Sequence, residues 1–507
     1  MPRSRGTALA AAAVALAVAG TACSGGAAER AATAERMLTL AVAADVSSWD
    51  PAVGAGGNSM GYLQAVYSSL TTLNADFSVS PGVATTWSYD RPKTTLTMTI
   101  RDGVTFSDGT PLDAAAVKAN LDRGLSTPGA TQSALAGIAS VEATGPTELM
   151  VKLKKPDPGL LYQLSMVPGM IASPKAFATL KTNPVGSGPY VLDLNASTRG
   201  TSYTFTRNPK YSLPATFGFD KLVMKALPDT NAMANAALSG QVDAGGVPMA
   251  SLPQVQGAGL EHRKMPGLIM GMWIVDRAGK LAPPLAKLKV RQAINHGLDA
   301  EGILKAVDKG NGDRRTQMFA AGTPAYLAAL NSRYPYDPDR ARRLLAEAGY
   351  PDGFELTLPS ENTYVPALYP IVAQQLGQIG IKVKYKPVSS NLITQQYLAG
   401  TYPAFMYTYT ATENWLDASL FLAKGGVFNP FHVEDPVVAK LMDRIAVAEE
   451  AERGKLFQEL NTHVVEQAWF APLYAATNLM VWKKDRVRID AAADQIFVFL
   501  RDYHPVG

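Results

Sequence analysis

Three short segments in the C-terminal half decide the fold class: FELTL at 354–358, LYPIVAQQLGQI at 368–379 and IKVKY at 381–385. The first and third alternate apolar and polar residues, which is typical of strands. The middle segment spaces its apolar residues as a helix does, and Gly380 follows it as a helix stop. A strand, a helix and a strand of these lengths predict a βαβ unit with a parallel sheet. The sequence therefore indicates an α/β protein.

Further periodic segments lie on both sides of this unit. Asp337-Pro338 forms a helix start, with an N-cap followed by proline, and Gly349 ends the helix that it begins. Asp229 begins an alanine-rich helix that Gly240 can end. The other predicted elements outside residues 75–180 are strands at 37–43 and 203–207, a helix at 62–70 and a strand at 404–409.

Residues 75–180 form a mixed α+β block of their own. Asp102-Gly103 supplies the residues that a tight hairpin needs at positive φ. We therefore expect a hairpin there, with Leu96–Ile100 and Val104–Phe106 as its two strands. The block also contains a helix capped by Asp113, and a strand at Leu149–Leu153.

Composition bounds the class of protein. The 507 residues are 47% hydrophobic and 18% charged, with a formal net charge of +4. These values exclude wholesale disorder, collagen, a coiled coil and a multispan membrane protein. The near balance of charges argues against a nucleic-acid partner, which would require concentrated basic charge. The single cysteine excludes an intramolecular disulfide framework and a multi-thiolate zinc site.

The N-terminus has the layout of a secretory signal. Arg3 and Arg5 precede an apolar run at 8–19, which is too short to span a bilayer. Gly20-Thr21-Ala22 then leads to Cys23, and small residues before a lone cysteine resemble a bacterial lipobox, although Gly20 stands where Leu or Val is usual. We expect residues 1–22 to be a signal peptide, Cys23 to be lipidated and 23–36 to be a flexible tether. The alternative is ordinary secretion without a lipid.

No motif indicates assembled catalytic machinery. Gly57-Asn58-Ser59-Met60-Gly61 matches the G-x-S-x-G pattern of serine hydrolases, but a glycine-rich loop precedes Ser59 where that elbow needs a strand. No two of the five histidines lie within one helical turn, so we expect no metal site and no cofactor. The protein is predicted not to be an enzyme, and a secreted serine hydrolase using Ser59 is the rival hypothesis.

One aromatic segment is a candidate binding site. From Tyr402 to Trp415 the chain begins as a strand and continues as a loop with Thr412 and Glu413. Loops at the carboxyl ends of strands are where open α/β sheets bind ligands. Aromatic rings beside polar groups suit a polar organic ligand that is half apolar. Aromatic core packing is the competing explanation, and the same holds for Trp49 in the first loop.

An ordered set of phrases resembles the family 5 extracellular solute-binding proteins, the receptors of peptide and nickel ABC importers. The main phrase is RDGVTFSDGTPL at 101–112, and the others follow in the family's order over about residues 37 to 500. These are VGSGPY at 185–190, RNPKY at 207–211, GQVD at 240–243, VRQA at 290–293 and YDP at 336–338 with LLAEAGY at 344–350. The phrases are rich in turn residues and contact no ligand, so they identify the fold without naming a substrate.

The resemblance implies a two-lobe periplasmic-binding-protein-like fold of type II, in the large cluster, with an extra α+β subdomain inserted in lobe I. Carried onto this chain, lobe I is 37–74 with 186–265 and 480–507. The inserted subdomain is 75–185, and lobe II is 266–479.

The resemblance also implies site residues. Peptide-binding members carry a Trp, and an Asp for the peptide's α-ammonium group, in the segment that matches Tyr409 to Asp417. Here Tyr409 takes the aromatic place, the acid's place falls near Thr412, and the adjacent Glu413 is the candidate substitute. After the first lobe crossing the family usually has an Asn, where this chain has Asp276. The predicted ligand-binding residues are Trp49, Met272, Trp273, Tyr407, Tyr409, Thr412, Glu413, Trp415 and Asp417.

The function implied by the resemblance is capture of a solute by closure of two lobes. We expect a lipid-anchored, monomeric protein outside the cytoplasm that binds a peptide or similar small organic solute and delivers it to an ABC permease. The alternative ligands are nickel, a metal chelate, an opine or an oligosaccharide. A purely sensory or scaffolding lipoprotein would have the same sequence features.

Overall fold

The computed structural model describes residues 35–54, 59–362, 366–492 and 495–506. Following the predicted division, residues 37–74, 186–265 and 480–507 are called lobe I. Residues 75–185 are called the insert, and residues 266–479 are called lobe II. Cys23 and the predicted signal and tether up to residue 34 lie outside the described residues.

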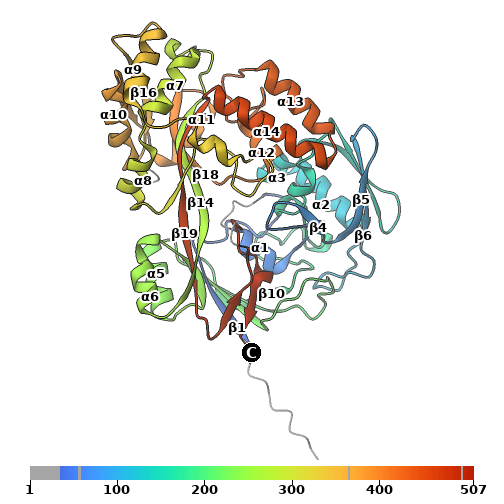
Figure 1. Ribbon diagram of the computed structural model, residues 1–507. Helices are drawn as coiled ribbons and strands as arrows, with labels where there is room; N and C mark the ends of the chain where they lie inside the picture. Colours follow the sequence, from blue (N-terminus) through green and yellow to red (C-terminus); the bar gives the residue numbers. More distant parts are fainter. Residues whose placement is uncertain (1–34, 55–58, 363–365, 493–494, 507) are drawn as a thin grey trace, which may run out of the picture. The chain divides into compact units, whose positions relative to one another are not determined.

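A large mixed sheet runs through both lobes in the described part of the chain (Figure 1). Its strands are ordered β10-β11-β12-β1-β13-β19-β14-β18, and β15 pairs with β19. The bounds are β1 Met37–Val42, β10 Tyr190–Thr198, β11 Ser202–Arg207, β12 Lys221–Ala226, β13 Ala244–Val247, β14 Glu261–Ile274, β15 Gly312–Arg314, β18 Ala404–Tyr409 and β19 Phe470–Trp482. The strands predicted at 37–43, 203–207 and 404–409 are confirmed.

Two long antiparallel strands, β14 and β19, carry this sheet from lobe I into lobe II. They pair from Glu261 opposite Trp482 to Trp273 opposite Phe470, and the register shifts between Pro266 and Ile269. Gly267 lies in this irregular stretch, where a Cβ on it would stand 2.5 Å from the carbonyl oxygen of Ala476. Only glycine allows the two backbones to approach so closely, and the crossing therefore depends on the absence of a side chain there.

The insert has its own sheet, with antiparallel order β5-β6-β8-β7. The bounds are β5 Ala84–Tyr89, β6 Thr95–Ile100, β7 Ile138–Ala143 and β8 Glu148–Leu153. In β6 the alternate residues Leu96, Met98 and Ile100 are buried. Helix α2 (Ala114–Ser126) begins at Asp113, whose carboxylate accepts a hydrogen bond of 2.8 Å from the backbone N–H of Ala116, as predicted.

The hairpin predicted at Asp102-Gly103 is wrong in one respect. A turn is present, with Gly103 at φ 74°, but β6 pairs with β5 and β8 and no returning strand forms at 104–106. Val104 and Phe106 are instead buried in the core of the insert, and only a single bridge joins Thr105 to Pro111. Burial of these side chains in the insert core replaces the pairing that local turn chemistry favours.

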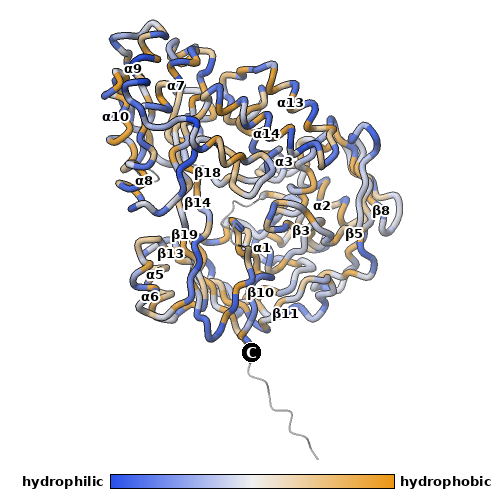
Figure 2. Tube along the Cα trace, viewed as in Figure 1, coloured by the Kyte–Doolittle hydropathy of each residue, from blue (hydrophilic) through white to orange (hydrophobic). Residues whose placement is uncertain are grey.

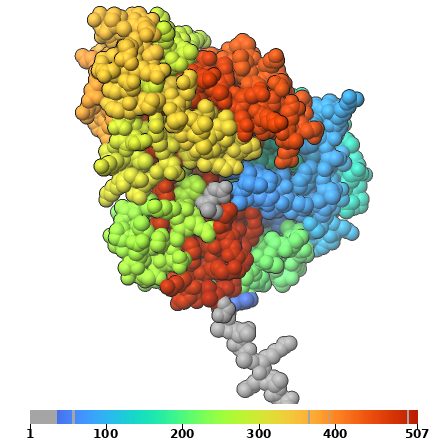
Figure 3. Space-filling model, in the orientation of Figure 1, coloured from blue at the N-terminus to red at the C-terminus, as the bar shows by residue number. Residues whose placement is uncertain are grey.

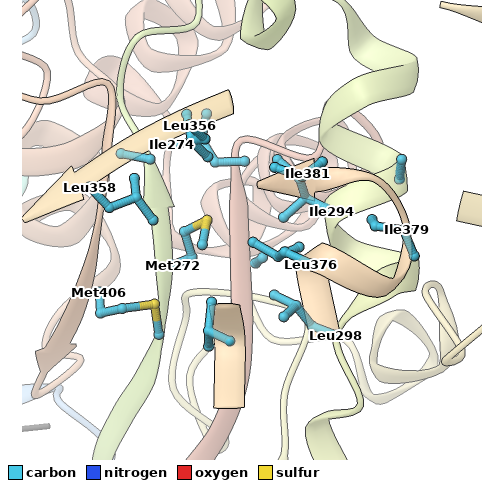
Figure 4. Packing of buried hydrophobic residues seen from close by; sticks show 14 of the residues in the cluster. Met272, Ile274, Ile294, Leu298, Leu356, Leu358, Leu376, Ile379, Ile381 and Met406 are labelled. Carbon is cyan, nitrogen blue, oxygen red and sulfur yellow. The ribbon is translucent and has the colours of Figure 1, made fainter. Parts of the chain in front are cut away.

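The predicted βαβ unit is confirmed in lobe II. Strands β16 (Phe354–Ser360) and β17 (Ile381–Pro387) pair in parallel around helix α10 (Leu368–Gln378). Figure 4 shows Leu356, Leu358 and Ile381 packed with Met272 and Met406 of the main sheet. The two sheets of lobe II therefore share one hydrophobic core.

Helices cover the sheets on both sides of the crossing (Figure 1). Their bounds are α1 Met60–Val66, α3 Ala130–Ala134, α4 Leu160–Gln163, α5 Thr230–Leu238, α6 Leu252–Gly257, α7 Leu288–Gly297, α8 Ala300–Asp308, α9 Pro338–Glu347, α11 Ser390–Leu398, α12 Asn414–Phe421, α13 Pro436–Val447 and α14 Glu450–Glu466. Short paired strands complete the fold: β2 Ser68–Ser69 with β9 Met170–Ile171, β3 Thr71–Leu73 with β4 Val79–Pro81, and β20 Val487–Ile489 with β21 Tyr503–Pro505.

Polar and apolar residues interleave along most of these elements (Figure 2). Among the described residues, none of the helices combines the length and the apolar character needed to cross a membrane.

Candidate functional site

The candidate binding segment begins at an edge strand. In the described structure β18 pairs with β14 on one side and ends the strand order of the main sheet. Met406 packs into one hydrophobic core of lobe II, while Phe405 and Tyr409 pack into a second core on the opposite face. The strand ends at Tyr409, and α12 begins at Asn414, so the loop predicted to reach Trp415 is shorter than expected.

Tyr409 occupies the end of the strand as a nearly buried aromatic residue. It is 8% exposed, and its ring stands edge-on to Trp273 with centroids 5.4 Å apart. Its hydroxyl oxygen is buried without a hydrogen-bond partner among the described residues. Burial raises the pKa of this hydroxyl well above its ordinary value, with a further contribution from the charge of Asp417. An unpartnered buried hydroxyl is costly, so a bound polar group would lower the free energy here.

Thr412 and Asp417 form one hydrogen-bonded unit. The Asp417 carboxylate accepts bonds from the Thr412 backbone N–H (3.0 Å) and hydroxyl (2.7 Å). Asp417 is buried, and this burial raises its pKa to about 7, against the opposing effect of the two Thr412 bonds. The residue in the family's acid position therefore holds a neighbouring acid in place.

Glu413 caps helix α12. Its two carboxylate oxygens accept bonds of 2.9 Å and 3.0 Å from the backbone N–H groups of Trp415 and Leu416. Burial raises the pKa of Glu413, and the charge of Asp157 adds to the rise, while the two N–H bonds oppose it. The negative charge lies at the positive end of the helix dipole, where it is stabilised.

The loop contacts the insert through Trp415. The indole Nε1 donates a hydrogen bond of 3.0 Å to Oδ1 of Asp157, which lies between β8 and α4. Burial raises the pKa of Asp157, against the bonds from Trp415 and from the Gly159 N–H. Asp157 Oδ1 and Glu413 Oε2 each lie 3.5 Å from the point where a Cβ on Gly159 would stand. Two half-buried carboxylates, one from the insert and one from lobe II, therefore face the same small space.

Beside this contact lies a cavity of about 580 Å³, within the ~300–1,000 Å³ range of small-molecule sites. Its walls come from the insert and from lobe II, and Figure 3 shows orange-red atoms of the α13 and α14 region directly against blue atoms of the insert. Its lining includes Phe77, Trp87, Tyr162, Glu413, Asn414 and Phe457. The charged residues among the described lining are Asp76, Glu413, Glu450 and Arg453, so three acids stand beside one cation. Aromatic walls with an excess of acidic groups suit an organic ligand that carries a positive charge.

Besides Tyr409, three other predicted site residues lie in hydrophobic cores. Trp49 is 5% exposed and packs edge-on against Tyr62 and Tyr203 in lobe I. Met272 and Trp273 are completely buried on opposite faces of β14. Met272 and Trp273 alternate along the apolar strand β14, while Trp49 lies in the first loop; packing partners enclose all three, which leaves little side-chain surface for a ligand in this structure. The competing explanation of core packing describes all three.

Tyr407 has a different place from Tyr409. It lines a smaller cavity with Glu361 and Tyr397, in the space between β18 and α11. Burial raises the pKa of its hydroxyl to about 12. Asp157 and Glu361, which the sequence did not single out, thus join the predicted residues. Asp157 follows Pro156 in a loop, and no local pattern relates it to a tryptophan 258 positions away.

Ser59 and the possible metal-ligating side chains are the groups on which the rival chemistries would depend. Ser59 is 2% exposed at the start of α1, and its hydroxyl lies 3.4 Å from that of Ser47. In the described part of the chain, no group of three or more His, Cys, Asp or Glu side chains is placed to hold a metal ion.

Comparison with known proteins identifies the family. The model of the bacterial extracellular solute-binding proteins, family 5, matches residues 78–427. The chain belongs to this family. The glutathione-binding protein GsiB of Salmonella paratyphi A is 30% identical over 370 residues, which cover 70% of each chain. The GsiB of Escherichia coli O157:H7 is 29% identical over 365 residues, covering 69% of each.

Solved structures share the two-lobe fold of family 5 proteins. NikA of Brucella suis, solved with Fe(III)-EDTA, has a TM-score of 0.77 and 24% identity, covering 93% of this chain and all of that one. DppA of Helicobacter pylori, solved with the peptide STSA, has a TM-score of 0.75 and 21% identity, covering 93% and 98%. AppA of Bacillus subtilis, solved with a nonapeptide, has a TM-score of 0.74 and 19% identity, covering 93% and 100%. The α/β two-lobe class predicted from the sequence is confirmed.

Proposed function

We propose that this family 5 protein captures a small peptide-like solute with a positively charged group and delivers it to an ABC permease. Family membership supports the role, and relatives named for glutathione and for peptides favour that ligand class. In this proposal the protein acts outside the cytoplasm as a monomer, held by a lipid on Cys23, and it catalyses no reaction. Closure of the lobes on the ligand would give the permease one state to recognise.

The observation that carries the ligand class is the group of acids around α12. Asp417 is buried, Glu413 and Asp157 are half-buried, and within the described residues none of the three forms a salt bridge, although the charge of Arg453 lowers the pKa of Glu413. A buried carboxylate without a cation is unfavourable, and a ligand ammonium group would compensate its charge. Tyr409 adds an aromatic ring and an unpartnered hydroxyl next to these acids. An ammonium group beside an amide or aromatic portion fits this combination.

A ligand screen tests the proposal. Purified protein is examined by native mass spectrometry for a carried ligand and then by thermal shift with reduced glutathione, di- to tetrapeptides, an opine, nickel and oligosaccharides. A ligand that binds only the folded state raises the melting temperature. We expect the peptides or glutathione to give the largest shift. A shift with nickel or oligosaccharide alone would contradict the ligand class.

Variants of the loop then test the site. With the ligand found in the screen, Glu413→Gln should weaken binding at least tenfold, since loss of one partner of a buried charged pair costs ~2–5 kcal/mol. Because Glu413 also caps a helix, Asp337→Asn is the matched control: Asp337 caps α9 with a bond of 2.8 Å to the Arg340 N–H. Equal affinities in wild type and Glu413→Gln would remove Glu413 from the site. Tyr409→Ala should weaken binding by ~1–3 kcal/mol through lost apolar contact.

A further inference from the structure

A second cavity lies wholly within lobe II, along the edge of β18 that β14 leaves free. Its volume is about 200 Å³, and it is lined by Glu361, Ile393, Tyr397, Met406, Tyr407 and Thr408, with Thr394 beside them. Water occupies about 30 Å³ per molecule in the liquid, so the space holds a group of several non-hydrogen atoms. It is smaller than a site for a whole ligand and suits one end group or side chain.

The floor of this cavity combines an acid with apolar and aromatic surface. Glu361 is 7% exposed, and Ile393, Tyr397 and Met406 are also buried. Ser390 donates a hydrogen bond of 3.1 Å from its hydroxyl to Oε2 of Glu361. The Tyr397 hydroxyl donates to the Met406 carbonyl oxygen at 3.2 Å, which fixes the ring against the strand.

The charge of Glu361 acts on the tyrosine hydroxyls around it. Burial raises the pKa of Tyr369 to about 12, and the Glu361 carboxylate contributes to that rise. Burial is also the main cause of the raised pKa of Tyr397, and the same carboxylate makes a smaller contribution. The cavity lining therefore combines the Glu361 carboxylate with the aromatic side chains of Tyr397 and Tyr407.

We propose that this cavity is a specificity pocket for a cationic end group, an ammonium or guanidinium on a short apolar stem. A carboxylate binds such a group by a charge-assisted hydrogen bond, tyrosine rings attract it through their faces, and Ile393 and Met406 contact the stem. The proposed function enters only in the statement that this stem is the side chain of a peptide-like ligand. Tyr407 and Tyr409 are two residues apart on β18, about 7 Å at the rise of a strand. A peptide-like ligand held near Tyr409 would thus place a basic side chain in the pocket.

The first test uses end-group probes rather than a whole ligand. Saturation-transfer NMR titrations compare n-butylammonium with 1-butanol, which has the same stem without the charge. Wild type should bind n-butylammonium at least tenfold more tightly than 1-butanol. Glu361→Gln should weaken n-butylammonium at least tenfold and leave 1-butanol within twofold. Equal binding of the two probes, or equal n-butylammonium binding in wild type and variant, would overturn the proposal.

Two further variants keep this test decisive. Glu355→Gln is the matched control, because Glu355 lies on β16 with its side chain 46% exposed in an ion pair with Lys384; it should leave both probes unchanged. Should Glu361→Gln fail to fold, Thr394→Leu replaces it, since Thr394 is an exposed lining residue. A leucine at position 394 should lower the affinity for n-butylammonium at least fivefold by filling the cavity. Undiminished binding in that variant would refute the proposal that the probe binds in this cavity.

Matched tripeptides separate this proposal from the proposed function. Ala-Ala-Lys should bind at least tenfold more tightly than Ala-Ala-Leu, and Glu361→Gln should abolish the difference. If both peptides bind equally to wild type, peptide capture stands and the cationic pocket is refuted. If neither peptide binds while n-butylammonium still depends on Glu361, the pocket stands and peptide capture is refuted.

Discussion

The indole Nε1 of Trp415 and the carboxylate of Asp157 are joined by a hydrogen bond of 3.0 Å between lobe II and the insert. A second contact between the same two parts is the ion pair of Lys93 with Glu449, at 2.8 Å. Lys93 also donates to the Ala448 carbonyl oxygen at 3.0 Å. The insert therefore contacts the candidate binding loop as well as lobe I.

Trp415→Phe tests the first contact. The aromatic side chain is kept and the N–H donor is lost, so the half-buried Asp157 carboxylate loses one of the bonds that favour its ionised form. The pKa of Asp157 should rise further, and the loss of unfolding free energy should be largest at pH values where Asp157 is ionised. We expect the variant to lose ~1–3 kcal/mol of unfolding free energy. Urea unfolding should show a larger loss at pH 8 than at pH 5, with Trp87→Phe as the control for removal of an indole. An identical loss at both pH values would contradict the role given to Asp157.

Asp417 makes stability depend on pH with a defined sign. Its pKa is raised to about 7 from 3.8, so between these values the folded protein holds a proton that the unfolded chain has released. Unfolding free energy therefore falls as pH rises from about 4 to 7, by up to about 4 kcal/mol at ~1.4 kcal/mol for each pKa unit. Asp417→Asn keeps an acceptor for Thr412 and removes this term. The variant should lose less stability than wild type over that range in urea unfolding; parallel pH profiles would refute the raised pKa.

Local chemistry in the sequence predicted the elements better than the site. Asp113, Asp229 and Asp337 cap their helices as expected, and β18 has its predicted bounds, because caps and alternation act within a few residues. Which side chains meet depends instead on distant segments. Trp273 is as apolar as any ligand-stacking tryptophan, but Tyr409 and Phe421 enclose it. Asp157 joins the candidate site only because the insert lies against α12, which no periodicity encodes.

A bidentate salt bridge joins the insert to lobe I. The Arg123 guanidinium on α2 donates to both carboxylate oxygens of Asp50, in the first loop of lobe I. Asp50 is 6% exposed, so Asp50→Ala would leave a partly buried arginine without its partner. We expect a loss of ~3–5 kcal/mol of unfolding free energy. Asp122→Asn, which removes an exposed pair with Lys118 on the same helix, should cost under about 1 kcal/mol in the same chemical-denaturation assay. Similar losses in both variants would contradict the anchoring role.

The predicted lipid anchor has a separate test. Cys23→Ala should move the protein from the membrane fraction to the medium of the producing cells, because a signal peptide alone gives no anchor. Ala22→Gly keeps a small residue before the cysteine and should leave the protein on the membrane. Retention of Cys23→Ala on membranes would exclude Cys23 as the anchor.

Gly267 is a position where the crossing between the lobes leaves no room for a side chain. A methyl group there would stand 2.5 Å from the Ala476 carbonyl oxygen, a backbone atom that cannot move aside by itself. Gly267→Ala should therefore cost ~1–3 kcal/mol of unfolding free energy, as overpacking does. Gly246→Ala on β13 is the control, because no atom lies within 4 Å of the point where its Cβ would stand. If the β14 and β19 crossing is also the hinge, Gly267→Ala should reduce the ligand-induced decrease in radius of gyration measured by solution scattering, while Gly246→Ala should leave it unchanged. Full compaction in a destabilised Gly267→Ala would show that the lobes close about another point.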